Sequence, residues 1–140
     1  MVVANPWRLR ATALTDAGFW HVFAVRLLTS PTCDPATLVD TSFLNLDESR
    51  ATSSGIFCES AFAFLCSFAY QINAPKYGFL GEPATSNDGS FQAWRGIPAS
   101  GSAWLAIELP AAVELGWVQL FPGPQKFATA VALEASVNRT

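Results

Sequence analysis

The C-terminal part of the chain contains three short stretches in which apolar and polar side chains alternate. They lie at 104–109, 113–121 and 130–136, and prolines and glycines separate them. A period of two residues, interrupted by proline and glycine, is typical of antiparallel strands that turn one face toward a core. The pattern therefore predicts three strands of one sheet, which the rest of the chain completes.

Two further strands are predicted near the N-terminus. At 7–14, apolar residues alternate with basic and hydroxyl side chains, which indicates a half-exposed strand. Residues 19–28 are apolar on both faces except for His21 and Arg26, as in a central strand. Because only a short Asp-Ala-Gly turn separates the two runs, they predict a β-hairpin.

The middle of the chain gives a weaker pattern. Residues 30–54 and 73–102 are rich in turn-forming residues and are predicted to be irregular. Between them, the apolar segment 56–72 alternates like a strand, yet its aromatic residues also fit one face of a helix. We expect a strand there, with the helix as the alternative. Because no other segment is convincingly helical, the chain is predicted to be an all-β sandwich.

Composition adds a hint about partners. A chain of 140 residues is expected to form a single domain, 1–140. Only 14% of its residues are charged, against about 25% in an average soluble domain. Such a chain either has a large core or has an outer surface that a partner covers.

Charge and hydropathy exclude some classes of partner. The net charge of −3 and the scattered basic residues argue against nucleic acid. No apolar run reaches the roughly 20 residues of a membrane-spanning helix. The N-terminus lacks the features of a signal peptide, which indicates a cytosolic protein or a mature or partial chain.

Three groups of residues in sequence order resemble the discoidin, or coagulation-factor type C, domain, above all its divergent algal and protist copies. The first group is Trp7-Arg8-Leu9-Arg10 followed by Trp20-His21-Val22, Leu27-Leu28 and Cys33; the second is Asn87-Asp88-Gly89-Ser90 with Trp94; the third is the strand pattern from Trp104 to Ser136. The resemblance implies an antiparallel jelly-roll β-sandwich of the galactose-binding-like type. The resemblance rests on the order and spacing of these motifs, because each motif alone is an unspecific strand pattern with a tryptophan.

The chain departs from that pattern in two places. The apolar segment 56–72 has no counterpart and is expected to be an insert. The sequence also stops at Asn138-Arg139-Thr140, where such domains continue with closing strands. We therefore expect that a final strand is lacking, or that the chain is a fragment, and that an open sheet edge binds a partner.

The resemblance also suggests ligand sites. Loops like the one at Asp88 can hold a structural calcium ion in galactose-binding-like domains, although an Asx turn is the favoured interpretation. A sugar platform is a second candidate, in which an aromatic ring stacks on the sugar and polar groups bind its hydroxyls. Its residues would be Phe91, Gln92, Trp94 and Arg95. The favoured alternative is that Trp94 is a core residue, as we expect for Trp7, Trp20, Trp104 and Trp117.

No motif indicates an enzyme. His21 is the single histidine, and neither a nucleophile motif nor a phosphate-binding loop accompanies it, so a packed role is expected. No cofactor is predicted apart from the calcium ion considered above. Whether any two of Cys33, Cys58 and Cys66 form a disulfide stays open.

The expected function is a non-catalytic structural or interaction subunit of a larger complex, for which a membrane-associated algal photosystem is one setting. Phe62, Phe64 and Phe68 would contact the other protein subunits. The alternative is an extracellular carbohydrate-binding module. Either function favours an organelle lumen or the cell exterior over the cytoplasm.

Overall fold

The computed structural model describes residues 3–14, 20–55, 74–80, 94–96, 103–122 and 128–135 of the chain. Strands dominate these residues, and every strand pair among them is antiparallel. The strands are β1 (Val3–Ala4), β2 (Trp7–Leu14), β3 (Trp20–Leu28), β4 (Ala51–Ser53), β5 (Trp94–Gly96), β6 (Ala103–Ile107), β7 (Val113–Glu114), β8 (Trp117–Pro122) and β9 (Ala128–Ala135). The predicted all-β class is thus confirmed at this level.

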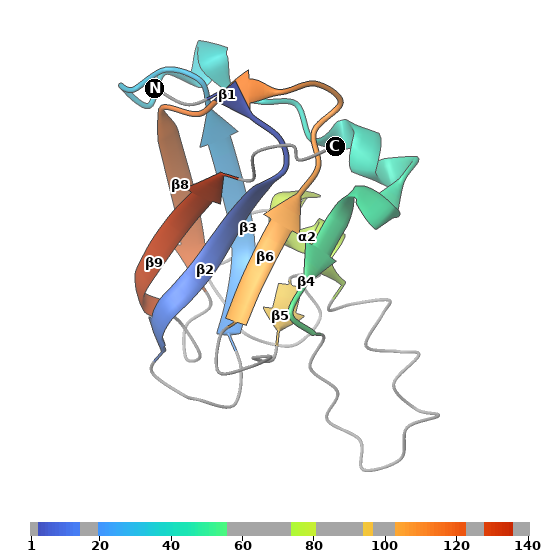
Figure 1. Cartoon of the computed structure of the whole chain (residues 1–140), viewed down its shortest axis with the longest axis vertical. Helices are drawn as coiled ribbons and strands as arrows, with labels where there is room; N and C mark the ends of the chain where they lie inside the picture. Colours follow the sequence, from blue (N-terminus) through green and yellow to red (C-terminus); the bar gives the residue numbers. More distant parts are fainter. Residues whose placement is uncertain are drawn as a thin grey trace.

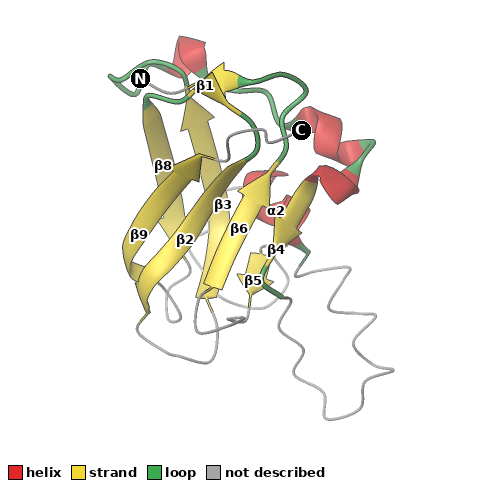
Figure 2. Ribbon diagram, viewed as in Figure 1, coloured by secondary structure: helices red, strands yellow, loops and turns green. Residues whose placement is uncertain are grey.

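The strands form two main layers. One sheet has the order β4-β6-β2-β9 and the other has the order β5-β3-β8, while β1 and β7 form a small separate pair. Figures 1 and 2 show the two main sheets stacked one behind the other. The hydrophobic core lies between them and takes side chains from both. This arrangement is consistent with the predicted sandwich.

The alternation at 7–14 separates buried from outward-facing residues, as predicted. Trp7, Leu9 and Ala11 are buried and belong to the core, whereas Arg8 and Arg10 lie on the outer face of the sheet. Strand β3 is buried along its whole length except at Arg26, as predicted for a central strand. Most of both faces is therefore covered, which explains why its sequence is apolar apart from His21 and Arg26.

The predicted hairpin between these two strands is wrong. Strand β2 pairs with β6 and β9, whereas β3 pairs with β5 and β8 in the opposite sheet. The strands face each other across the core, because both carry apolar residues that are buried by stacking rather than by lateral pairing. The predicted C-terminal strands also do not form one sheet. Strands β6 and β9 belong to the four-stranded sheet, whereas β8 belongs to the three-stranded sheet and β7 pairs with β1.

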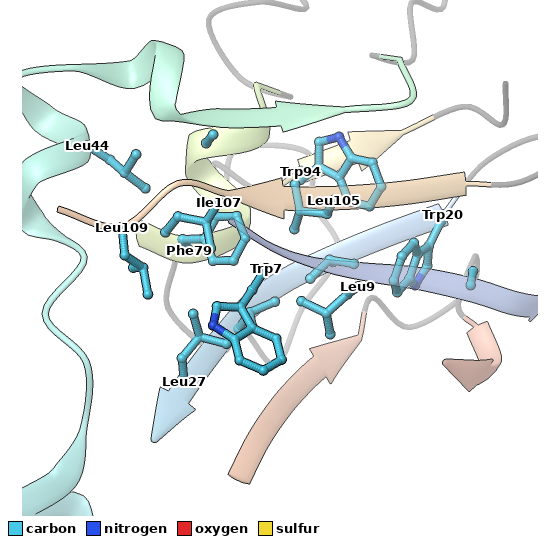
Figure 3. Close-up of a cluster of buried hydrophobic side chains, with 14 of the residues drawn as sticks. Trp7, Leu9, Trp20, Leu27, Leu44, Phe79, Trp94, Leu105, Ile107 and Leu109 are labelled. Atoms are coloured by element: carbon cyan, nitrogen blue, oxygen red, sulfur yellow. The ribbon is translucent and has the colours of Figure 1, made fainter. Parts of the chain in front are cut away.

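The core is centred on tryptophan and leucine side chains (Figure 3). Trp20 and Trp94 are both fully buried, and their rings meet edge to face with centroids 5.2 Å apart. Edge-to-face pairs of this kind stabilise a core beyond the area that they bury. Trp7 is also buried, and its indole Nε1 donates a hydrogen bond of 3.3 Å to the carbonyl of Val113.

Several elements lie in segments predicted to be irregular. Segment 30–54 contains strand β4 and three short 3-10 helices, η1 (Pro35–Thr37), η2 (Ser42–Asn45) and η3 (Glu48–Arg50). Segment 73–102 contains α2 (Pro75–Leu80) and strand β5. Each of these elements has six residues or fewer, too short for a hydrophobic period to be recognised in the sequence.

Candidate functional site

One side of the sandwich is closed by α2. The helix lies beside β3, β5 and β4, and its Phe79 is buried in the core. Its backbone comes so close that a Cβ atom at Gly78 would be 2.6 Å from the Leu105 side chain. A larger residue at this position would require the Leu105 side chain to move.

The opposite side, between β8 and β9, is not closed in this way by any described helix. Both strands are the last of their sheets on that side (Figure 1). Val131 and Leu133 of β9 stand opposite Ala11 and Leu9 of β2, so they share the core-facing side of the sheet. Nevertheless, Val131 is 36% exposed and Leu133 is 40% exposed. We call the side of the sandwich between β8 and β9, where Val131 and Leu133 are exposed, the open side.

A charged cluster lies on the outer face of the same sheet. Arg8 Nη2 is 2.7 Å from one Glu134 oxygen, and Arg10 Nε is 3.1 Å from the other. Partial burial works against ionisation of Glu134, but the hydrogen bonds from Arg8 and Arg10 outweigh it and hold the pKa of this carboxyl below its ordinary value. Glu134 is therefore ionised and paired at neutral pH.

A second feature is the outer face of the three-stranded sheet. Leu28 of β3 stands between Trp117 of β8 and Leu38, to which it is joined by an isolated bridge. Trp117 is 44% exposed and Leu38 is also exposed, whereas Leu28 between them is buried. The expected core role of Trp117 is therefore wrong.

A polar row runs beside the apolar one. Arg26 pairs with Gln119 of β8, and Arg26 and Asp40 both line a pocket of about 250 Å³ next to Leu38. Backbone and side-chain hydrogen bonds from Ser42 hold the pKa of Asp40 below its ordinary value, so its carboxylate is an ionised acceptor. We call this arrangement the outer-face pocket.

The predicted sugar platform is corrected by the burial of its central residue. Trp94 is fully buried against Trp20, so its indole has no exposed face on which a sugar could stack. The alternative, a core tryptophan, describes its position. Arg95 belongs to β5 and pairs with His21. Phe91 and Gln92 lie outside the described residues.

The predicted metal and partner residues also lie outside the described residues. These are Asp88 for calcium and Phe62, Phe64 and Phe68 for a partner. Gly55 and Ala74, which flank the segment holding the three phenylalanines, both line a cleft of about 440 Å³ beside β4. Lys76 and Glu48 also line this cleft and form an ion pair at 2.6 Å.

The remaining candidate residues are the single histidine and the three cysteines. His21 is buried beside Phe23, with ring centroids 4.5 Å apart, which confirms its expected packed role. Cys33 is a free thiol, while Cys58 and Cys66 lie outside the described residues. Among the described residues, no group of three or more His, Cys, Asp or Glu side chains is placed to hold a metal ion. Within the same ranges, no helix has the length and apolar character needed to cross a membrane.

Comparison of the chain with protein-family models, with curated proteins and with solved structures found no match. The candidate sites are therefore described by their geometry alone. The open side and the outer-face pocket contain residues of strands whose alternation predicts a framework role. The sequence contained one signal for the exposure of Trp117, because Gly116 directly before it interrupts the run at 113–121. In the structure, the backbone of Gly116 lies close to the backbone of Ser30 and Pro31.

Proposed function

We propose that this chain is a non-catalytic structural subunit that binds another protein through its open side. The observation that carries the proposal is the exposure of Val131 and Leu133, although both side chains share the core-facing side of the sheet. Apolar side chains left open at an edge strand favour the addition of a further strand from a partner. On the side that α2 closes, the end strands β4 and β5 have only three residues each.

On this proposal the chain belongs to a larger assembly in an organelle lumen or outside the cell, and a membrane-associated photosynthetic complex is one setting. The low content of charged residues supports this, because a surface covered by a partner does not need charge for solubility. We also propose that the two sheets are those of a discoidin-like jelly roll. The two antiparallel sheets that enclose the core support this proposal.

Leu133→Lys is expected to release the partner without unfolding the chain. A lysine at this position can extend its ammonium into solvent, but it places a charge where the partner's apolar side chains would pack. The measurement is co-purification of tagged chain from the cells that make it, followed by sizing of the particle. We expect at least about a tenfold loss of the co-purified protein, as for truncation of a binding hot spot.

Leu46→Lys is the matched control for this substitution. Leu46 is 95% exposed and lies in the loop between η2 and η3, away from β9. The control is expected to retain the partner fully, and both variants should melt within a few degrees of the wild type. Equal recovery of the partner with Leu133→Lys and wild type would overturn the proposal.

A second candidate function is carbohydrate binding at the outer-face pocket. Arg26 and Asp40 line the pocket and supply hydrogen-bonding groups. Gln119 pairs with Arg26 on the neighbouring strand β8, and Trp117, two residues before Gln119, supplies an exposed ring for the apolar face of a sugar. Arg26 and Asp40 carry opposite charges, which favours a neutral saccharide over a phosphate or a cation. The volume lies just below the roughly 300–1,000 Å³ of drug-sized sites and suits a single sugar ring.

Trp117→Ala is expected to weaken binding of neutral hexasaccharides of glucose, galactose or mannose by about tenfold or more. Isothermal titration calorimetry with the purified chain measures this affinity. Trp104→Ala is the control, because Trp104 lies partly buried on the outer face of the other sheet. This candidate fails if none of the three sugars binds at millimolar concentration, or if both alanine variants lose affinity equally.

A further inference from the structure

Among the described residues, strand β9 is a long end strand of its sheet. It has eight residues, while β4 and β5, the end strands on the side that α2 closes, have three each. Its pairing with β2 is regular from Val131 to Ala135, and the register shifts lie only beyond Val131. Natural edge strands avoid further pairing by being short, by a bulge, by proline or by an unpaired charge. The stretch from Val131 to Ala135 has none of these features.

The one charged residue of β9 does not protect the edge either. Glu134 lies on the outer face and is held by Arg8 and Arg10, so its charge is neutralised within the same sheet. Its outer-face neighbours on the strand, Ala130 and Ala132, have small side chains. A second strand can therefore approach β9 without burying an unpaired charge.

We propose that the open side binds a second copy of this chain, with the two β9 strands pairing antiparallel about a two-fold axis at Ala132. The inference rests on the proposed function and names the partner for the same site. Twofold pairing requires a surface that is complementary to itself. The sequence of β9 meets this requirement better with the axis at Ala132 than with the axis moved by one residue in either direction.

That register follows from the alternation of side chains. With the axis at Ala132, Val131 of one protomer lies opposite Leu133 of the other, twice, on the core-facing side of the joined sheet. Glu134 lies opposite Ala130, so the two carboxylates do not face each other. An axis at Val131 would pair the two Val131 residues but place Leu133 opposite the polar Thr129 twice. An axis at Leu133 would pair the two Leu133 residues but place Val131 opposite the smaller Ala135 twice.

The joined sheet would also close both cores at once. The core-facing side chains that are now exposed on each protomer would cover one another, which removes apolar surface from water on both copies. The strand order would run from β4 through β9 of one protomer into β9 through β4 of the other. Each α2 would remain at the far side, where it already covers its own sheet edge.

Cysteine cross-linking of the purified full chain tests the register. Under mild oxidation, Ala132→Cys is expected to form a covalent dimer at least tenfold faster than Ala130→Cys. The Ala132 positions meet at the axis, whereas the two Ala130 positions are separated by four residues, about 13 Å along the strand. The wild-type chain, with its native cysteines, gives the background rate.

Sedimentation of the same proteins tests the association itself. The wild-type chain is expected to be a dimer at micromolar concentration, and Leu133→Lys to raise the dissociation constant at least tenfold. A monomeric wild type at hundreds of micromolar, or equal cross-linking at both positions, overturns the second-copy inference. If Leu133→Lys then still releases a co-purified protein, the proposed function stands without the second-copy inference. If Leu133→Lys changes neither the sedimentation nor the co-purification, the proposed function and the second-copy inference both fail.

Discussion

Trp94→Ala is expected to lower the free energy of unfolding by about 3–5 kcal/mol, the usual range for deleting a large buried aromatic side chain. Trp94 is fully buried, and its ring packs edge to face on Trp20 at 5.2 Å. Alanine would remove that contact and leave a cavity between the two sheets. Urea titration followed by far-ultraviolet circular dichroism measures the loss.

Trp117→Ala provides the matched comparison for this prediction. It removes the same side chain from the outer face of β8, where much of the ring is already in water. We expect it to cost less than about 1 kcal/mol, because little buried area is lost. Comparable losses for the two variants would contradict the assignment of Trp94 to the core and of Trp117 to the surface.

Gly96→Ala is expected to destabilise the chain by about 3 kcal/mol or more, at the upper end of the range for overpacking. A Cβ atom at Gly96 would lie 1.8 Å from Cζ2 of Trp94, which is closer than any two such atoms can approach. The indole cannot simply move away, because it is buried in the core. Either the ring leaves its place or β5 separates from Trp20, its partner in the sheet.

A double-mutant cycle identifies the cause of that loss. In a Trp94→Phe background, the outer ring of the indole is absent, and Gly96→Ala is expected to cost less than about 1 kcal/mol. The same urea titration gives all four stabilities. If the cost of Gly96→Ala is unchanged in the Trp94→Phe background, the clash with the indole is not its source.

The alternation of side chains predicts which residues face the core better than it predicts which strands are neighbours. The buried positions of β2 follow directly from the pattern, because this strand has one apolar face. In β6, Leu105 and Ile107 are buried as the alternation predicts, but Ala106 on the other face is buried as well. Neighbours are decided by how two apolar faces stack across the core. The short turn before residue 20 therefore suggested a hairpin, but β2 and β3 belong to opposite sheets.

The functional candidates were harder to predict for a related reason. Val131 and Leu133 show the alternation of a core-facing strand, and their orientation agrees with it. Their exposure depends on what stands opposite them at the end of the sandwich, which a local pattern does not contain. In the same way, Trp94 and Trp117 are both tryptophans on strands, yet one is buried and the other is exposed.

An open edge was nevertheless expected from the sequence. The exposed side chains of Val131 and Leu133 lie on β9, an end strand of its sheet among the described residues. The outer-face pocket had no such signal. It depends on the bridge between Leu28 and Leu38, which joins a strand to a segment predicted to be a loop.

Hydrogen exchange along β9 tests the central claim most directly. The measurement compares the isolated Leu133→Lys chain with the native assembly purified through tagged wild-type chain, and mass spectrometry follows peptides that cover Ala128–Ala135. In the isolated chain, the β9 amides that point away from β2 have no strand partner among the described residues and should exchange rapidly. We predict that they become protected in the assembly, while peptides covering Ala51–Ser53 of β4 do not change. Equal exchange along β9 in both samples would contradict a protein interface at the open side.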